Sequence, residues 1–198
     1  MSKMSIFWSV YFMLFIIFLL PTLSYLVMGL PDFLNRNSLT EKACFIGHIL
    51  SGIVVYTVAP FQFSTSVRLR EPNKHRMLGK VYIFSSLVCI LTLYANILPN
   101  SICESCQPSQ YMATSLWLIF ILLGLWSILN KKMELHRRFM MSGFICAAYF
   151  VTVRLVSYTL MGFFDLITPN EHASFLVSDI FVWLLPLLIF WSIWLRNK

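Results

Sequence analysis

The sequence predicts an all-α integral membrane protein, a bundle of six transmembrane helices with both termini in the cytoplasm. Composition is the first reason: 59% of the 198 residues are hydrophobic and 12% are charged, whereas soluble chains are roughly 45–50% apolar and about 25% charged. Apolar residues also gather in six runs near the roughly 20 residues that a helix needs to cross hydrocarbon. Basic residues, finally, are concentrated at alternate ends of these runs, the pattern that orients a multi-pass protein.

Each predicted span is an apolar run bounded by turn-forming or charged residues. The first run is too long for the apolar region of a secretory signal and ends without a small-residue cleavage site, so we expect it to remain as a helix. The later runs must also be helices, because backbone N–H and C=O groups cannot stay unpaired in lipid. The breaks contain Pro31-Asp32, Glu71-Pro72-Asn73, Pro99-Asn100, Asn130-Lys131 and Pro169-Asn170. The spans cover residues 6–28, 43–63, 79–98, 111–129, 139–163 and 174–195, within a single domain of residues 1–198.

The orientation follows from the lysines and arginines near the span ends. Twelve of the 15 fall on one side, which we take as the cytoplasm: Lys3, Arg68, Arg70, Lys74, Arg76, Lys80, Lys131, Lys132, Arg137, Arg138, Arg196 and Lys198. Arg36 and Lys42 fall on the other side, with Asp32, Glu41, Glu104, Asp165 and Glu171. The net charge of +7 therefore reflects membrane orientation and predicts no nucleic-acid partner. The expected location is the cell inner membrane, with the lipid bilayer as partner.

Histidines occur at both ends of the predicted bundle. His75 and His136 lie just before the inner ends of the third and fifth spans, each followed by an arginine, and His48 lies about 7 Å below the outer end of the second. Two histidines on different helices can ligate a haem iron, and neighbouring arginines suit its propionates. The same His-Arg pairs could equally serve as cationic anchors, and His48 as a packing residue. Both alternatives stay open.

Two charged residues fall inside predicted spans, where ionisable groups are costly and indicate function or pairing. Arg154 lies near the middle of the fifth span and Asp179 about one and a half turns into the sixth. We expect an ion pair between them, and whether that pair also lines a site stays open. Cys103 and Cys106 form a C-E-S-C motif on the outer side, where a disulfide can persist. A loop disulfide is the favoured interpretation, and a redox-active dithiol is the alternative.

Three strings carry a family resemblance: APFQF at 59–63, RLREPNKHRMLGKVYIF at 68–84 and ELHRRFMMSGFICAAYFVTVRL at 134–155. With a histidine in the preceding helix, they resemble the bacterial membrane family catalogued as domain of unknown function 2306. That family typically shows G-P-F-Q-F, L-R, H-R-x-x-G-R-x-Y, H-R-R-W-M-x-R and R-L. The matching positions, which span most of the second to fifth predicted helices, are His48, Pro60, Phe61, Gln62, Phe63, Arg70, His75, Arg76, Gly79, Tyr82, Trp117, His136, Arg137, Arg138, Met140, Arg154 and Leu155.

The chain departs from that family pattern at several positions. Ala59 stands for glycine, Lys80 for arginine and Phe139 for tryptophan, and Met141-Ser142 replaces the arginine expected after the methionine. If that arginine serves an anionic ligand in the family, the site here is weaker. The resemblance favours a shared role for both His-Arg phrases, because any basic residue would anchor a loop. The family is similar to b-type membrane cytochromes only by analogy, and such analogy does not establish function.

Two functional hypotheses follow, and neither assigns a catalytic residue or decides whether the chain is an enzyme. In the first, the chain binds haem b and transfers electrons, with quinone or a redox protein as partner. The iron ligands would be His48, His75 and His136, and the groups holding propionates or a quinone oxygen would be Arg76, Arg137 and Arg154. In the second, it is a cofactor-free membrane protein that binds or transports a small molecule, or an accessory subunit.

Overall fold

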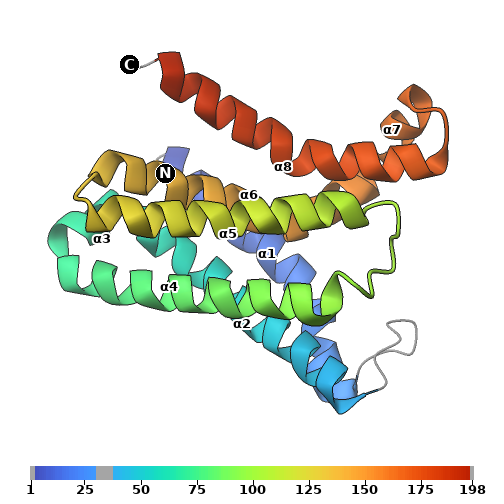
Figure 1. The fold of residues 1–198 in the computed structure, drawn as a ribbon, viewed down its shortest axis with the longest axis horizontal. Coiled ribbons are helices and arrows are strands. Elements are labelled where there is room, and N and C mark those ends of the chain that lie inside the picture. Colours follow the sequence, from blue (N-terminus) through green and yellow to red (C-terminus); the bar gives the residue numbers. More distant parts are fainter. Residues whose placement is uncertain (1–2, 30–37, 197–198) are drawn as a thin grey trace. The chain divides into compact units, whose positions relative to one another are not determined.

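The computed structural model describes residues 3–29 and 38–196, which form helices and no strand (Figure 1). Several residues used above for turns and orientation lie outside the described residues: Pro31, Asp32, Arg36 and Lys198. The chain divides into two compact units, unit 1 from Met1 to Asn100 and unit 2 from Ser101 to Lys198. Each unit is described by itself below, and the expectation of a single domain stays a prediction.

The described residues of unit 1 are mostly helical. Its elements are α1 (Lys3–Met28), α2 (Leu39–Phe63), α3 (Thr65–Arg70), α4 (Pro72–Thr92) and a π-helical turn, η2 (Leu93–Ile97), that continues α4. Ser38 begins α2 with a capping box, in which its side chain accepts from the Glu41 amide and the Glu41 carboxylate accepts from the Ser38 amide. Gly29 follows α1 with φ of 90°, a backbone conformation that only glycine adopts without strain.

The centre of unit 1 is the pairing of α2 with α4. Small side chains on both helices are buried there, including Ser51 and Ala59 on α2 and Ser86 and Cys89 on α4. Without a hydrophobic driving force in lipid, helices associate where small residues let their backbones approach closely. On the other side of α2, the Tyr11 hydroxyl of α1 donates to the Tyr56 carbonyl at 3.1 Å.

Unit 2 contains α5 (Gln107–Leu129), α6 (Met133–Thr159), α7 (Met161–Ile167) and α8 (Glu171–Arg196). A tight turn joins α5 to α6, and the two helices lie side by side (Figure 1). Lys131 makes this turn with φ of 58°, and the Lys132 amide donates to the Ser127 carbonyl at 2.9 Å to close the helix end. Helix α8 packs on α6, α5 and α7.

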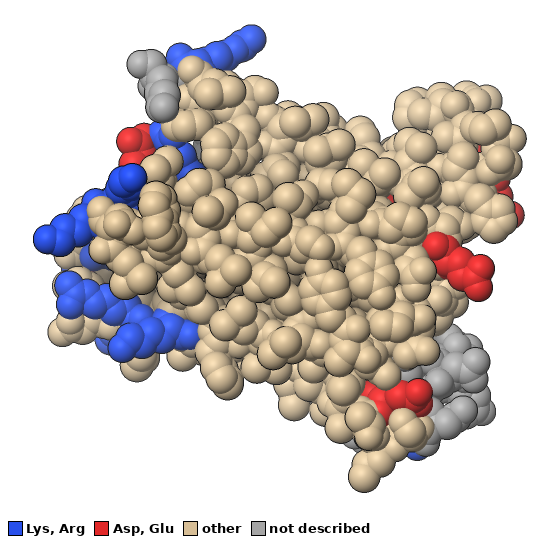
Figure 2. Space-filling view, viewed as in Figure 1, with Lys and Arg blue, Asp and Glu red and all other residues tan. Residues whose placement is uncertain are grey.

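The all-α membrane fold is confirmed. Among the described residues, five helices are long and apolar enough to cross a bilayer: α2, α4 with η2, α5, α6 and α8. Helix α1 has 26 residues, but its described apolar stretch is only Trp8–Ile17, so the sixth span stays a prediction. Figure 2 shows charged side chains at the ends of the helices and uncharged surface along their length, as a bilayer requires.

Helix boundaries differ from those predicted in two ways. The connection predicted between the second and third spans is largely helical, because it contains α3 and the first turns of α4, and α6 likewise begins at Met133. Charged residues lower hydropathy without preventing a helix, so apolar runs underestimate helix length at the membrane surface. The span predicted over 139–163 instead ends at Thr159, and the following residues belong to α7.

Candidate functional site

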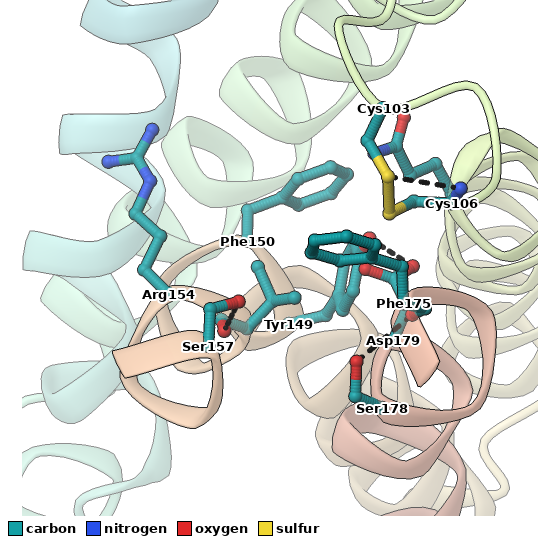
Figure 3. Close-up of a pocket in the computed structure, with 11 residues that line it drawn as sticks. Cys103, Cys106, Tyr149, Phe150, Arg154, Ser157, Phe175, Ser178 and Asp179 are labelled. Carbon is teal, nitrogen blue, oxygen red and sulfur yellow. Dashed lines mark hydrogen bonds between the residues drawn. A yellow bond between two sulfur atoms is a disulfide. The ribbon is translucent and has the colours of Figure 1, made fainter. Parts of the chain in front are cut away.

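Unit 2 contains a pocket of about 290 Å³ between the N-terminal parts of α5 and α8 and the C-terminal half of α6. The lining residues come from the loop before α5 and from all three helices: Cys103, Cys106, Gln110, Tyr149, Phe150, Val153, Arg154, Ser157, Phe175, Ser178 and Asp179. Three kinds of group meet there, namely a sulfur pair, aromatic rings and charged side chains (Figure 3). The volume is at the lower end of the range for small-molecule pockets.

The rigid wall of this pocket is a buried hydrogen bond between α6 and α8. The Tyr149 hydroxyl donates to Asp179 Oδ2 at 2.6 Å, and the two residues are 1% and 2% exposed. Tyr149 also packs in a buried cluster with Ala113, Val182 and Trp183. Trp183 Nε1 donates to the Ser109 hydroxyl at 2.9 Å, which joins α8 to the first turn of α5. The carboxylate therefore occupies a fixed position.

Arg154 and Asp179 line the same pocket, as their predicted depths require, but the predicted ion pair is not formed. Asp179 accepts from Tyr149 instead, and Arg154 is exposed. In Figure 3 the Arg154 side chain extends away from Asp179, while Tyr149 and Asp179 point toward one another. Within the described part of the chain, the ion pairs are Lys74–Glu71 and Arg138–Glu134. Arg154 is thus a cationic donor at the pocket without a carboxylate partner among the described residues.

Cys103 and Cys106 are joined by a disulfide, the pairing favoured above. Both cysteines line the pocket, which the sequence did not predict. Cys106 is the N-cap residue of α5 and is buried, whereas Cys103 is half-buried. The remaining cysteines, Cys44, Cys89 and Cys146, are free.

His48 faces α4 within unit 1. Its Nδ1 lies 3.2 Å from the Cys89 sulfur, and Ser51, one turn along α2, donates to the Gly47 carbonyl at 2.6 Å. A Cβ on Gly47 would lie 3.6 Å from the Thr92 methyl group, an ordinary van der Waals contact, so α2 and α4 are closely packed there. This environment is that of a half-buried histidine with a packing partner.

His75 and His136 are each the fourth residue of a helix, α4 and α6 respectively. In unit 1, the Gln62 amide donates to the His75 carbonyl at 3.0 Å. In unit 2, His136 Nδ1 lies 2.8 Å from the Gly124 carbonyl oxygen, and because a carbonyl oxygen can only accept, Nδ1 is the donor. The two histidines belong to different units, and their sharing of one site stays a prediction.

The arginines beside these histidines differ in their surroundings. Arg76 and Arg137 are exposed. Arg138 instead pairs with Glu134 and lies over the Trp194 ring, with its guanidinium carbon 3.4 Å from the ring centroid. Arg138 is therefore occupied by a cation–π contact that anchors α6 to α8. Of the arginines that follow the two histidines, Arg76 and Arg137 are therefore the exposed ones, and a ligand could reach them.

A haem between histidines of a single unit does not fit. Two axial nitrogens must lie about 4 Å apart, since each metal–nitrogen bond is about 2 Å. His48 lies against Cys89, and His75 is about 21 Å from Cys89 along α4 at 1.5 Å per residue. In unit 2, His136 and His172 begin α6 and α8 at opposite ends of the unit. Among the described residues, no group of three His, Cys, Asp or Glu side chains could hold a metal.

Several pocket residues were not singled out from the sequence. Tyr149, Phe150 and Phe175 are aromatic residues within apolar runs, where aromatic residues are common. A usable signal was the helical spacing of Tyr149 and Val153 with Arg154 and Ser157, which places polar and aromatic groups on one face of α6. The spacing alone could not predict a pocket, because the pocket is also lined by α8 and by the loop that contains Cys103 and Cys106.

A family model described as predicted membrane protein (DUF2306) matches residues 45–195, more than half of the chain. No curated protein and no solved structure matches it. The matched range includes all eleven residues of the pocket and both His-Arg phrases.

Proposed function

Because the chain belongs to the DUF2306 family of membrane proteins, we propose that it acts within the bilayer by binding a small amphipathic molecule of the quinone class. The observation behind this proposal is the pocket of about 290 Å³ that combines Arg154, Asp179 and two phenylalanines. We further propose the cell inner membrane as its location, with the pocket toward the outer surface.

The lining supports a flat ring with polar oxygens. Phe150 and Phe175 offer aromatic faces, against which a ring can pack in offset or edge-on geometry. Arg154 is exposed and offers several N–H donors that a ring oxygen can accept. The other polar side chains are engaged with the protein: Tyr149 donates to Asp179, and Ser178 donates to the Phe175 carbonyl.

Depth and size also support such a ligand. Arg154 lies about 8 Å before the end of α6, and Asp179 about 12 Å after the start of α8, at 1.5 Å per residue. A quinone ring at this depth would keep its oxygens near the membrane surface and its tail in lipid. The volume accommodates a single-ring head group, whereas a porphyrin needs a larger space.

The test is a binding measurement on the full chain in lipid nanodiscs. Duroquinone, whose ring carbons all carry methyl groups, is titrated while tryptophan fluorescence is followed. We expect Arg154→Gln to raise Kd by about tenfold, because a hydrogen bond to a charged group contributes about 1.5–3 kcal/mol. Phe175→Ala should raise it as well. Arg196→Gln, a matched change at an exposed arginine outside the pocket, should leave Kd unchanged. Absence of binding, or equal Kd values in all variants, overturns the proposal.

A second candidate function is electron transfer through a haem b with His136 as a ligand. The specific observation in its favour is the contact of His136 Nδ1 with the Gly124 carbonyl, since a histidine ligand usually donates its other N–H to such a partner. Haem would supply one-electron chemistry. Arg137, exposed beside His136, would bind a propionate. A reduced-minus-oxidised spectrum with b-type bands that disappear in His136→Ala supports it, and a colourless preparation from haem-replete cells contradicts it.

A further inference from the structure

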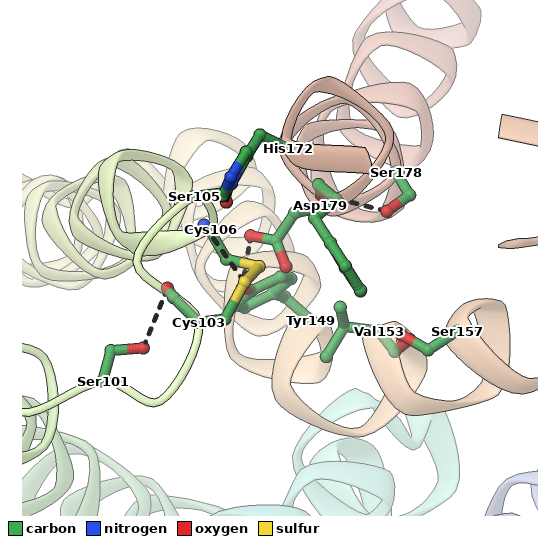
Figure 4. Close-up of a disulfide and its surroundings, with 11 residues drawn as sticks. Ser101, Cys103, Ser105, Cys106, Tyr149, Val153, Ser157, His172, Ser178 and Asp179 are labelled. Carbon is green, nitrogen blue, oxygen red and sulfur yellow. Dashed lines mark hydrogen bonds between the residues drawn. A yellow bond between two sulfur atoms is a disulfide. The ribbon is translucent and has the colours of Figure 1, made fainter. Parts of the chain in front are cut away.

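We propose that the Cys103–Cys106 disulfide is a redox centre that exchanges two electrons with the quinone bound in the same pocket. This inference rests on the proposed function and extends it to a reaction class, the oxidation of dithiols by quinone at the outer surface of the membrane. Figure 4 shows the disulfide with its neighbours.

The position of the disulfide suits redox chemistry better than a structural role. The cysteines are three residues apart, and the stabilisation that a cross-link gives grows with the length of the loop it closes. A bridge closing so short a loop therefore contributes little to holding the fold. Cys103 and Cys106 both line the pocket, together with aromatic and charged residues. A ligand in the pocket would therefore lie beside the disulfide.

The two cysteines are also unequal. Cys103 is half-buried and Cys106 is buried. The Cys106 amide, at the N-terminus of the 23-residue helix α5, lies 3.3 Å from the Cys103 sulfur. An N–H donor and a helix N-terminus both stabilise a thiolate. Cys103 is thus the accessible sulfur for an incoming thiol, and its thiolate is stabilised by the Cys106 amide when it later leaves the mixed disulfide.

Two further hydrogen bonds hold the loop. The Ser105 hydroxyl, between the two cysteines, lies 2.7 Å from Nδ1 of His172 at the start of α8. The Ser101 hydroxyl donates to the Cys103 carbonyl at 3.3 Å (Figure 4). Together with the Trp183–Ser109 bond at the base of α5, these contacts fix the loop beside the pocket when the disulfide is broken.

The reaction balances in two steps. A substrate dithiol attacks the Cys103 sulfur, forming a mixed disulfide and releasing the Cys106 thiolate. The second substrate thiol then displaces Cys103, so that the substrate is oxidised and the two cysteines are reduced. These two displacements are the first step. In the second step, the Cys103 and Cys106 thiols lose two electrons and two protons to the quinone, and the S–S bond re-forms. The quinone becomes a quinol as its two carbonyl oxygens take up the protons.

A quinone is the acceptor that the surroundings favour. Arg154 and Asp179 of the pocket lie within helices that can span a membrane, so an acceptor soluble in lipid can reach it. Quinones carry two electrons with two protons, which matches the conversion of a dithiol to a disulfide.

A single-turnover experiment tests the inference. The full chain in nanodiscs is reduced, freed of reductant under argon and mixed with duroquinone, which cannot add a thiol to its ring carbons. We expect duroquinol to form in a one-to-one ratio with the chain and the alkylation of Cys103 and Cys106, read by mass spectrometry, to disappear. The double variant C103S/C106S keeps the three other cysteines and should form no duroquinol, whereas Cys44→Ser should behave as the wild type.

The outcomes separate this inference from the proposed function. If duroquinone binds with the expected dependence on Arg154 but the wild-type cysteines remain alkylated, the redox centre is wrong and the binding function stands. If duroquinone neither binds nor oxidises the cysteines, both proposals are wrong. Equal duroquinol formation by C103S/C106S also overturns the inference. Alkylation of Cys103 and Cys106 is measured on the wild type. The inference can therefore be tested even if the C103S/C106S variant does not fold.

Discussion

The hydrogen bond between Tyr149 and Asp179 gives the most quantitative prediction about the pocket. Tyr149→Phe removes one hydroxyl and leaves the ring that packs against Ala113 and Trp183. Asp179, only 2% exposed, then loses the 2.6 Å donor that holds its carboxylate. Because the side chain stays almost the same size, the change measures the hydrogen bond and little of the packing.

The expected loss is about 1.5 kcal/mol of unfolding free energy. Side-chain hydrogen bonds in water contribute about 1.5–3 kcal/mol when one partner is charged. Double-mutant cycles within a membrane protein average about 0.6 kcal/mol with a maximum of about 1.7 kcal/mol. The short distance and deep burial place this bond near that maximum, which corresponds to roughly a tenfold change in the unfolding equilibrium constant.

The assay is reversible unfolding in mixed detergent, applied as a double-mutant cycle of Tyr149→Phe with Asp179→Asn. Thr152→Val is the matched control, because it removes a hydroxyl from an exposed position on the same helix, where Thr152 bonds only to its own helix. We expect this control to change stability by less than about 0.5 kcal/mol. A coupling energy near zero between Tyr149 and Asp179, or an equal loss in the control, would refute the reasoning.

Three other predictions concern helix packing, the α5–α6 turn and orientation. A Cβ on Gly124 would lie 2.7 Å from the Met140 sulfur, whereas one on Gly143 would meet its nearest neighbours at 3.5 Å. Because the flexible Met140 side chain must turn away, Gly124→Ala should be about 0.5–1 kcal/mol less stable than Gly143→Ala in unfolding measurements, and equal stabilities would argue against this packing. Lys131→Gly should raise stability by about 1 kcal/mol, since φ of 58° is strained for lysine, and a loss would contradict the turn. Impermeant labels should reach tags at Lys131 and Asn170 from opposite compartments, and labelling from one compartment would exclude this orientation.

The sequence was sufficient for the fold class and for the family. Apolar runs of about 20 residues can only be helices in lipid, and five of the six are confirmed as long apolar helices. The motifs around His75 and His136 identified the family that the match over residues 45–195 confirms. Helix ends were less predictable, because charged residues lower the hydropathy of helical turns such as the first turn of α4. An apolar run therefore stops short of the true helix end.

The site was predictable only in part. The depths of Arg154 and Asp179 brought both to one pocket, yet depth does not determine rotation about a helix axis, and Asp179 bonds to Tyr149 instead. Cys103 and Cys106 were expected to form a disulfide, but their contact with the pocket depends on the path of a loop between two helices. The path of this loop depends on individual hydrogen bonds such as Ser105–His172. No periodic pattern in the sequence indicates such bonds.

One measurement tests the central claim, that the pocket of unit 2 is a binding site, most directly. A photoreactive quinone is cross-linked to the full chain in nanodiscs, and the labelled peptides are identified by mass spectrometry. We expect label on residues 149–157 of α6 and 175–179 of α8, and we expect competing duroquinone to reduce it. Label confined to other helices, or label that duroquinone does not displace, would contradict the claim.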